Sequence, residues 1–567
     1  MAAPPGFAGG GSPDRPRELS AVVWTPVEIS LEAASSHVWW EFPVTAVFTH
    51  AGSGTRLELP GFWDGDRRYV VRFAPPRRGA WTFRTRSADK GLDAVRGTIS
   101  ARTPSAAELR RNGNLRGHLR ISPDGRYFTY ADGTPFFLLG DTVWAMNTAR
   151  CGLGENSDGP FYVYLADRGK KGFTTIFMSF MRGFGDTTME PAGQRNEGGY
   201  PFVDADPARL NPAYFRALDA RMRAIWERGF VTAGHPTWFG KHNCFFDRDT
   251  ARRIVSYLAV RYAAFNHIWS LSGEFQYALR DCEWSPEDFH RLGRTLQALN
   301  PYRHPVSAHP SGRTHWEAPF NVQSSRGLIP AGWIDHNWLQ TGQSAGRLFN
   351  IPLRLQENYA LSPPMPALLA EGFYERASDR AHAYHARWQA WTAFLSGAAG
   401  YGYGAFGIWQ FYDPEDPYGE TGKPGKDTIP WREALELEGS GQLRFVRQVL
   451  TGLEWWSLRP HREWLVLNGR ENPMPGPKDI SPPHCAARPG RTYVVYIPRG
   501  NADKRLLLTH LAKAAYEARW VDPRTGAETA VDPPPQGVEE WLISARPEPA
   551  GEDWVLVLTA DRRRGPR

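Results

Sequence analysis

The sequence predicts a multidomain α/β protein, with a central (β/α)8 barrel flanked by an all-β domain on either side. Within residues 115–452, eight short apolar runs alternate with amphipathic helical stretches. Residues 19–103 and 455–567 instead show the period-two alternation of strands, broken by turn residues. The length of 567 residues accommodates one barrel of about 250 residues or more and two smaller domains.

The N-terminal part of the chain predicts an Ig-like β-sandwich. Residues 1–18 are rich in Gly and Pro and predict a disordered tail. In residues 19–103, strands are expected at 27–32, 38–49, 69–73 and 81–86. The turn residues between them, such as Asp64-Gly65-Asp66, favour short antiparallel connections.

The central part predicts the barrel. The eight apolar runs begin near Phe136, Phe173, Phe230, His267, Pro305, Ile334, Pro366 and Tyr401. Helices are expected between them, for example at 212–227, 249–265, 286–298 and 380–394. Ser285 followed by Pro286 is a helix start signal. An open doubly wound sheet is the alternative, but no Gly-rich phosphate loop follows the first run, which favours the barrel.

The C-terminal part, residues 455–567, predicts a second β-sandwich. Strands are expected at 493–497, 505–509, 516–521, 540–543 and 554–558. The segment 522–526 is a strong turn, and the three prolines from Pro533 to Pro535 exclude regular structure there.

Composition and charge exclude several classes of protein. Apolar residues make up 41% of the chain and charged residues 22%, which is ordinary for a globular protein. No stretch reaches the ~20 apolar residues of a membrane span, and the net charge of +7 is not concentrated in one stripe, so neither a membrane nor nucleic acid is an expected partner. The first 20 residues lack the apolar core of a secretory signal, which favours a cytoplasmic location.

The cysteines and aromatic residues add two further indications. The four cysteines are far apart and contain no CxxC pair, so no disulfide framework or cysteine zinc site is indicated. Aromatic residues reach 13% of the chain, and their flat apolar faces suit the stacking of sugars. No feature of the sequence indicates an oligomeric state or a cofactor.

Two glutamates are the candidate catalytic residues. In a barrel the chemistry lies at the carboxyl ends of the strands. Glu274 follows the fourth apolar run and Glu371 ends the seventh, and strands four and seven lie nearly opposite each other. Two carboxylates that flank a scissile bond are the equipment of glycoside hydrolysis. The alternative for either residue is a salt bridge to one of the many arginines.

Other side chains at the strand ends are candidate substrate-binding residues. They are Asp141, Trp144, His235, Trp238, His309, Gln340, Tyr374, Tyr403 and Trp409. Asp141 could orient a sugar hydroxyl or cap a turn, with no preference between the two. Among the other acids, Glu375 is expected to start the next helix, and Asp335 to be structural.

The histidines and serines do not favour a different chemistry. His235, His309, His336 and His242 lie on or near strands three, five and six, but no His-x-His pair on strand one and no His-Glu-x-x-His motif completes a metal site. We therefore expect no metal, and expect His235 and His309 to hydrogen-bond a sugar or orient a glutamate. No Gly-x-Ser-x-Gly elbow of a serine hydrolase is present.

Several motifs in order along the chain resemble the apiosidase-like glycoside hydrolases. The motifs are GRYF at 125–128, DGTPFFLLGDTVW at 132–144, RGKKGF at 168–173, residues 268–274, EGFYE at 371–375 and GYGYG at 400–404. The flanks also fit: GFWDG at 61–65 resembles the Ig-like domain that precedes this barrel, and residues 493–499, 520–526 and 552–558 resemble a C-terminal β-sandwich of the collagen-binding type.

The resemblance implies a retaining enzyme with Glu274 as the acid/base and Glu371 as the nucleophile. The chain departs from the family at one point. Many relatives carry Asp after two glycines at the end of strand four, whereas this chain has Ser272-Gly273-Glu274, and related retaining barrels have Asn where Gly273 stands. The longer acid indicates a substrate that differs from an apioside.

The function predicted from the sequence is a retaining, cofactor-free O-glycosidase that acts on an oligo- or polysaccharide. The long segments 181–210 and 239–250 after strands two and three favour exo action. Three alternatives remain: a non-catalytic carbohydrate-binding protein on a decayed barrel, a metal-dependent barrel hydrolase, and a structural assembly protein.

Overall fold

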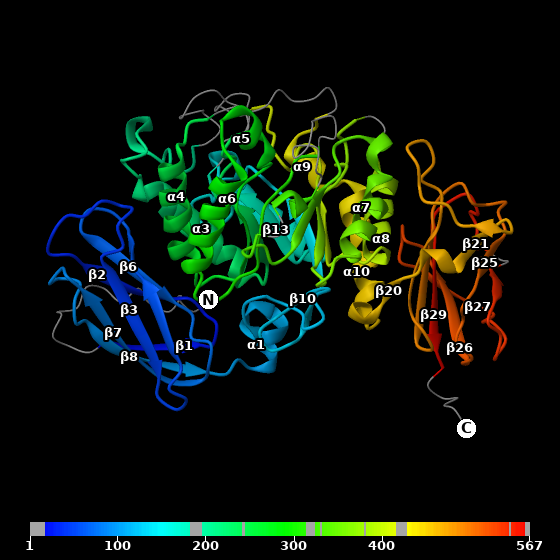
Figure 1. Ribbon diagram of the computed structural model, residues 1–567, viewed down its shortest axis with the longest axis horizontal. Helices are drawn as coiled ribbons and strands as arrows, with labels where there is room; N and C mark the ends of the chain where they lie inside the picture. Colours follow the sequence, from blue (N-terminus) through cyan, green and yellow to red (C-terminus); the bar gives the residue numbers. More distant parts are fainter. Residues whose placement is uncertain are drawn as a thin grey trace.

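The structure is a computed structural model. It describes residues 17–181, 195–240, 244–312, 324–328, 331–378, 381–415, 428–543 and 546–561. Figure 1 shows three parts in a row, with the N-terminal sheets at one end, the helix-covered barrel in the middle and the C-terminal sheets at the other end. Of the predicted N-terminal tail, only Arg17 and Glu18 lie in the described part, where they begin a strand.

Eight parallel strands form a nearly closed barrel, in the order β16-β15-β14-β13-β12-β19-β18-β17. The strands are β12 (Leu138–Thr142), β13 (Thr175–Ser179), β14 (Val231–His235), β15 (His267–Ser270), β16 (Val306–Ser307), β17 (Asn337–Gln340), β18 (Ala367–Glu371) and β19 (Gly400–Tyr403). At the seam between β16 and β17, the Asp335 N–H donates to the Val306 carbonyl, and the Val306 N–H donates to the Asp335 carboxylate. The barrel prediction is confirmed, and Asp335 is structural as expected.

Helices cover the outside of the barrel (Figure 1). They are α2 (Pro160–Lys170), α3 (Pro212–Glu227), α4 (Arg248–Tyr262), α5 (Gln276–Asp281), α6 (Pro286–Ala298), α7 (Asn350–Tyr359), α8 (Ala383–Leu395), α9 (Trp431–Leu435) and α10 (Glu438–Thr451). The start of α6 follows the sequence signal: the Ser285 side chain accepts from the Asp288 N–H, and the Asp288 carboxylate accepts from the Ser285 N–H.

A small three-stranded sheet closes the amino end of the barrel. Its strands are β9 (Arg120–Ile121), β10 (Phe128–Thr129) and β11 (Pro135–Phe136), and it follows α1 (Ala106–Arg111). Phe128 and Phe136 pack in one cluster with the interior side chains Leu138 and Trp338. Because this end is filled by apolar side chains, a ligand can reach the barrel interior only from the carboxyl ends of the strands.

The N-terminal part consists of two sheets packed around one core. One sheet has the order β1-β8-β7-β3-β4 and the other β2-β6-β5. Their strands are β1 (Arg17–Val22), β2 (Val27–Glu32), β3 (Val44–His50), β4 (Arg56–Pro60), β5 (Phe62–Trp63), β6 (Arg68–Phe73), β7 (Gly79–Ser87) and β8 (Arg96–Arg102). The expected antiparallel arrangement holds except that β1 pairs with β8 in parallel, which covers the edge of β8.

The C-terminal part is all β, in two sheets of order β20-β23-β24-β29-β26-β27 and β22-β21-β25-β28. Their strands are β20 (Arg459–Pro460), β21 (Leu465–Leu467), β22 (Arg470–Glu471), β23 (His484–Arg488), β24 (Thr492–Ile497), β25 (Leu506–Leu508), β26 (Tyr516–Val521), β27 (Glu528–Val531), β28 (Trp541–Ile543) and β29 (Trp554–Ala560). The sheet that contains β24 lies against α8, where the rings of Tyr496 and Trp391 stack with centroids 6.1 Å apart.

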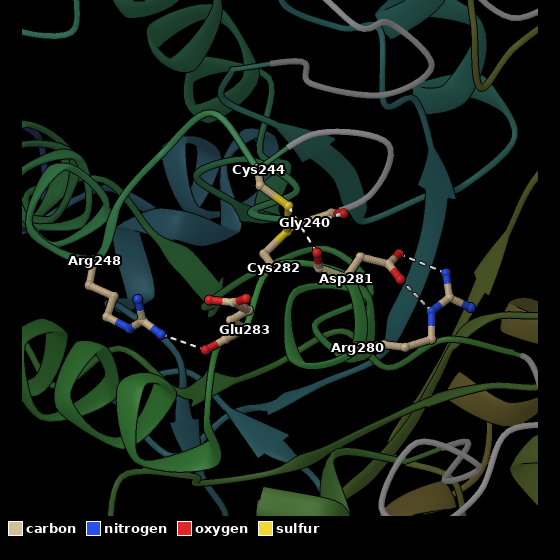
Figure 2. The surroundings of a disulfide bond; sticks show 7 residues. All are labelled: Gly240, Cys244, Arg248, Arg280, Asp281, Cys282 and Glu283. Atoms are coloured by element: carbon tan, nitrogen blue, oxygen red, sulfur yellow. Dashed lines mark hydrogen bonds and ion pairs between the residues drawn. A yellow bond between two sulfur atoms is a disulfide. The ribbon is translucent and has the colours of Figure 1, made fainter.

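One disulfide is present, between Cys244 and Cys282 (Figure 2). The sequence expectation of no disulfide is wrong at this pair, because the bond joins two loops that are 38 residues apart in the chain. Cys151 and Cys485 are buried free thiols. In the described part of the chain, no helix combines the length and the apolar character that a membrane span requires.

Candidate active site

Strand alternation decides which side chains enter the barrel. Along β12, Leu138 belongs to the interior cluster and Leu139 to the outer one under the helices. Thr142 therefore points into the barrel at its carboxyl end, as Leu138 does further down. The same alternation along β14, from Val231, aims His235 into the interior.

Glu371 enters the barrel because of a β-bulge. β17 and β18 pair residue by residue up to Leu339 and Leu369, but the next partners are Gln340 and Glu371, which leaves Ala370 as an extra residue. Without this bulge Glu371 would share the outward face of Leu369. The extra residue turns the Glu371 carboxylate to the same side of the sheet as Gln340. Gln340 lies two residues after the interior Trp338, so both side chains point into the barrel.

The Glu371 carboxylate is held by neutral donors and faces a histidine. Its Oε1 accepts hydrogen bonds from Gln340 Nε2 at 2.7 Å and Gln343 Nε2 at 3.1 Å. Its Oε2 lies 3.3 Å from His309 Nε2. The side chain is 10% exposed. These contacts fix the orientation of the carboxylate in the barrel interior.

Glu274 lies at the end of β15 in an unusual backbone conformation. Its φ is +35°, a value that costs energy for any residue with a side chain, and the side chain is buried. The preceding Gly273 packs on the Trp238 indole so closely that a Cβ at this position would lie 2.5 Å from it. Trp238 thus leaves room only for Gly at position 273.

Four rings from β12, β14 and β16 or the loops that follow them pack together near Glu371. Trp144 lies against Trp238 with ring centroids 5.2 Å apart and against His309 at 5.4 Å. His235 contacts Trp238 edge-on at 4.1 Å. All four side chains are buried. The structure therefore brings together Trp144, His235, Trp238 and His309, which the sequence predicted as binding residues.

Buried polar atoms without a hydrogen-bond partner gather at these strand ends. Within the residues that the structure describes, they include both ring nitrogens of His235, Nδ1 of His309 and Oε1 of Gln340. Burial, followed by the charge of His309, lowers the pKa of His235 well below its ordinary value, so this ring is neutral and can donate and accept. Such atoms are costly unless a ligand pairs with them.

Tyr374 and Trp409 complete the same region. Burial raises the pKa of the Tyr374 phenol well above its ordinary value, and the nearby Glu371 carboxylate raises it further. The phenol is therefore a neutral hydrogen-bond donor close to Glu371. Trp409 is half-buried against the interior cluster.

Asp141 and Tyr403, two predicted substrate-binding residues, face away from this region. Asp141 Oδ2 accepts from Arg168 Nε at 2.5 Å and from the Tyr164 hydroxyl at 2.8 Å, and Oδ1 accepts from the Thr142 N–H. Both carboxylate oxygens of Asp141 thus accept hydrogen bonds, and the side chain lies on the outer face of the barrel, under the helices, as Leu139 does. The structure therefore does not place Asp141 with the other predicted binding residues, and its main partner is the buried Arg168.

Tyr403 is engaged in a helix cap instead of the site. Its hydroxyl donates to Glu375 Oε2 at 2.6 Å, and the Gly439 N–H donates to Glu375 Oε1 at 3.2 Å. Glu375 therefore caps the N-terminus of α10 from a position eight residues before α8 begins, and the expectation that it starts the next helix is wrong. Tyr403 is buried with it on the outer face of the barrel.

The described residues contain no group of three or more His, Cys, Asp or Glu side chains arranged to hold a metal ion. His336 accepts a hydrogen bond from Trp338 Nε1 at 2.8 Å. His242 lies outside the described residues.

Two site residues were not predicted from the sequence. Thr142 could have been found by counting alternate residues from the apolar Leu138. Gln343 lies in the loop after β17, where its amide donates to the carboxylate of Glu371 and to the Gly372 carbonyl and accepts from the Tyr374 N–H. No local pattern distinguishes this loop glutamine from others.

The family model of the apiosidase-like catalytic domain matches residues 122–457, which is more than half of the chain. The chain belongs to the apiosidase-like family. A domain of unknown function matches at residues 20–88, and a collagen-binding-like domain of a collagenase matches at 478–559. This apiosidase-like barrel thus carries the two flanking domains that the sequence motifs resembled.

Solved structures of glycoside hydrolases share the fold of the apiosidase-like chain. A Bacteroides vulgatus protein assigned as a glycoside hydrolase has a TM-score of 0.70 at 16% identity, covering 96% of this chain and all of its own. A glycoside hydrolase family 5 protein from the same organism has a TM-score of 0.64 at 20% identity, covering 79% and 94%. Another glycoside hydrolase has a TM-score of 0.63 at 20% identity, covering 80% and 99%. A comparison with curated protein sequences gives no match.

Proposed function

We propose that this protein is a retaining O-glycosidase in which Glu371 is the nucleophile and Glu274 the acid/base. The observation that carries the proposal is the bulge in β18, which turns Glu371 into the barrel and onto two amide donors and His309. Glu274 follows β15, which lies nearly opposite β18 in the barrel, and the family model covers both residues.

The reaction has two steps. In the first, a carboxylate oxygen of Glu371 attacks the anomeric carbon, the glycosidic C–O bond breaks, and Glu274 gives its proton to the leaving oxygen. In the second, Glu274 takes a proton from water, the water oxygen attacks the anomeric carbon, and the ester to Glu371 breaks. The amide donors of Gln340 and Gln343 keep one Glu371 oxygen in place while the other reacts.

The substrate proposed is an O-linked oligo- or polysaccharide. The rings of Trp144 and Trp238 offer flat apolar surface, and His235, Thr142, Tyr374 and the unpaired Gln340 Oε1 offer donors and acceptors for hydroxyl groups. The remaining predicted aromatic residue, Trp409, extends the apolar surface. The long segments of sequence after β13 and β14 favour release of terminal sugars.

The test is a screen on aryl glycosides with matched variants. Wild type, Glu371→Gln and Glu274→Gln would be compared on apioside, arabinosides, galactoside and glucoside. Glu357→Gln, on the outer helix α7, is the control because its carboxylate is partly exposed and pairs with Arg354. We expect release by wild type and the control, none by Glu371→Gln, and a loss of about 10²–10⁴-fold for Glu274→Gln.

The leaving group separates the two roles. An activated dinitrophenyl leaving group needs little protonation, so it should restore the first step in Glu274→Gln but not in Glu371→Gln. NMR of the first-formed sugar should show the anomeric configuration of the substrate. Activity in Glu371→Gln, or inversion of configuration, would overturn the assignment; sugar binding without any turnover would indicate a carbohydrate-binding protein.

A further inference from the structure

The disulfide joins the two loops that carry Trp238 and Glu274. After β14 the chain passes through Trp238 and Gly240 and reaches Cys244 shortly before α4. After β15 it passes through Glu274 into α5, and Cys282 is the C-terminal cap of this helix. The Cα atoms of the two cysteines are 5.4 Å apart.

Close packing between the same loops surrounds the bond. A Cβ at Gly240 would lie 2.3 Å from the Ala278 Cα, so this loop rests directly on α5. Gly273 packs on the Trp238 indole in the same way, and its N–H donates to the Thr237 carbonyl at 3.2 Å. The disulfide therefore lies at one end of the contact between the two loops, and Gly273, next to the candidate acid/base Glu274, lies at the other end.

A hydrogen bond also crosses the outer rim of this contact. Figure 2 shows Arg248, at the start of α4, donating to the Glu283 carbonyl just beyond Cys282. The two sulfur atoms lie near backbone carbonyls, Cys244 Sγ at 3.5 Å from that of Asp281 and Cys282 Sγ at 3.8 Å from that of Gly240. Sulfur atoms in a disulfide have no hydrogen to donate, so these contacts add little beyond the covalent bond.

The strained backbone of Glu274 needs such support. A residue with φ of +35° keeps that conformation only where its surroundings leave it no alternative. Glu274 is followed by a helix of only six residues, which is too short to be stable by itself. Fixing the far end of α5 at Cys282 restricts the helix and, through it, the backbone that orients the Glu274 carboxylate.

We propose that the Cys244–Cys282 disulfide is formed in the functional protein and is a positioning element that holds Glu274 and Trp238 in their working arrangement. The bond is accessible, since Cys244 is exposed and Cys282 half-buried, whereas the two free thiols are buried. An accessible disulfide persists in an oxidising compartment, so the proposal places the functional protein in one, unlike the cytoplasmic location that the sequence favours. The effect on turnover rests on the proposed function; the bond and its effect on the loops do not.

Reduction by a dithiol such as dithiothreitol supplies the reaction that tests this. Two electrons and two protons pass from the dithiol to the bond, the S–S bond breaks, Cys244 and Cys282 become thiols, and the dithiol becomes a cyclic disulfide. Thiol titration of the full chain in denaturant should find two thiols before reduction and four after it. Four thiols in protein prepared without reductant would overturn the proposal.

Hydrogen exchange then tests the positioning role without any substrate. We expect amide exchange to accelerate at residues 237–240 and 274–282 after reduction, and to stay unchanged in β12 and in β24. The Cys244→Ser/Cys282→Ser variant should resemble reduced wild type and should not respond to dithiothreitol. Should this variant fail to fold, reduced wild type provides the same comparison. Exchange that is equal in both forms would overturn the role.

Kinetics on an aryl glycoside completes the experiment. We expect reduction to lower kcat about tenfold or more with a smaller change in KM, and reoxidation to restore it. A Cys151→Ala/Cys485→Ala variant is the matched control, because it keeps the bond and should respond to dithiothreitol as wild type does. An unchanged kcat in an active enzyme contradicts the positioning role, whereas accelerated exchange in a protein inactive in both forms contradicts only the proposed function.

Discussion

At the level of single residues, the proposed reaction depends on how the Glu371 carboxylate is held. Its Oε1 accepts from two glutamines, and its Oε2 faces His309. Gln343 does more than donate to the carboxylate, since the same amide also bonds to the backbone of Gly372 and Tyr374. The Gln343 side chain thus fixes the Glu371 carboxylate together with the backbone of Gly372 and Tyr374.

Replacing Gln343 by glutamate tests this arrangement. A second carboxylate beside Glu371 disfavours the ionised nucleophile, so the acid limb of the kcat/KM profile should move to higher pH by about one unit. Gln343→Ala, which adds no charge, should lower kcat with a smaller shift. Because Gln343 is exposed, both variants should fold, with a melting temperature lowered by about a few degrees for the lost hydrogen bonds. Superimposable pH profiles for Gln343→Glu and wild type would count against this role.

Position along the sequence selected some residues whose side chains enter the barrel and others, such as Asp141, whose side chains face outward. One geometric reason accounts for both outcomes. The place at a strand end selected Glu274, Glu371, His235 and Gln340 as candidates, but it does not tell which face of the strand a side chain occupies. Alternation from Leu139 would have placed Asp141 outside. The same rule would have wrongly placed Glu371 outside as well, because the bulge at Ala370 is not visible in the sequence.

At the scale of elements, the seam between β16 and β17 places a buried acid in the barrel wall. The Asp335 carboxylate accepts the Val306 N–H at 2.9 Å. Burial raises the pKa of Asp335 from its ordinary value to about 6, and the hydrogen bond from Val306 only partly offsets this. Folding therefore favours the protonated form of this side chain.

Replacing Asp335 by asparagine should stabilise the protein above pH 6. The contribution of protonated Asp335 to the free energy of unfolding is fully present below pH 4, near the pKa of this side chain in the unfolded chain. It is lost as the pH rises through 6, the pKa in the folded protein. At pH 8 the buried charge then costs about 2–3 kcal/mol. Asparagine keeps an acceptor for the Val306 N–H without the charge.

Melting temperatures of wild type and Asp335→Asn across pH 4 to 8 provide the measurement. The variant should melt a few degrees higher at pH 8, and the difference should vanish toward pH 4. A lower melting temperature at pH 8, or a gain that is the same at every pH, would show that the charge of Asp335 is not the cause.

Elements with strong local signals were predicted closely, and elements set by distant contacts were not. The bounds of α3 and α6 match the prediction, where Pro opens the helix and, in α6, Ser caps it. β3 was expected from residue 38 but begins at Val44, directly after Pro43, which cannot donate to a sheet. The pairing of Cys244 with Cys282 depends on two loops that meet only in the folded barrel.

At the scale of the whole molecule, a buried ionic network joins the N-terminal sheets to the barrel. Arg72 on β6 and Arg261 on α4 both bond to Asp219 on α3, at 2.9 and 2.6 Å, and Arg261 also reaches Asp64 at 3.0 Å. Burial alone would raise the pKa of Asp219, but the charges of Arg261 and Arg72 hold it below its ordinary value. The carboxylate compensates two guanidinium groups that are almost fully buried.

Asp219→Asn should loosen this interface. The loss should be smaller than the about 3–5 kcal/mol of an isolated buried ion pair, because Arg72 keeps Glu28 at 2.9 Å and Arg261 keeps Asp64 at 3.0 Å. We expect limited proteolysis to cut the variant near residues 103–105 and to release the N-terminal sheets faster than in wild type. Glu227→Gln, on the exposed end of the same helix, is the control and should behave as wild type. Equal cleavage rates in all three proteins would contradict this role of the network.

The order of the three parts was predictable from the sequence, because periodicity changes from two to helical and back along the chain. How the parts dock was not, since Arg72, Asp219 and Arg261 look like ordinary surface charges in sequence. The same holds at the other end, where Arg387 on α8 pairs with the fully buried Asp553 just before β29 at 2.6 Å.

The central claim is that Glu371 forms a covalent bond to the sugar. Wild type would be incubated with the 2-deoxy-2-fluoro, dinitrophenyl-activated form of the best aryl glycoside, quenched, and analysed by peptide-mapping mass spectrometry. Our account predicts a mass increase of one fluorosugar on Glu371 and none in Glu371→Gln. A label on Glu274, or continued hydrolysis with no labelled peptide, would contradict it.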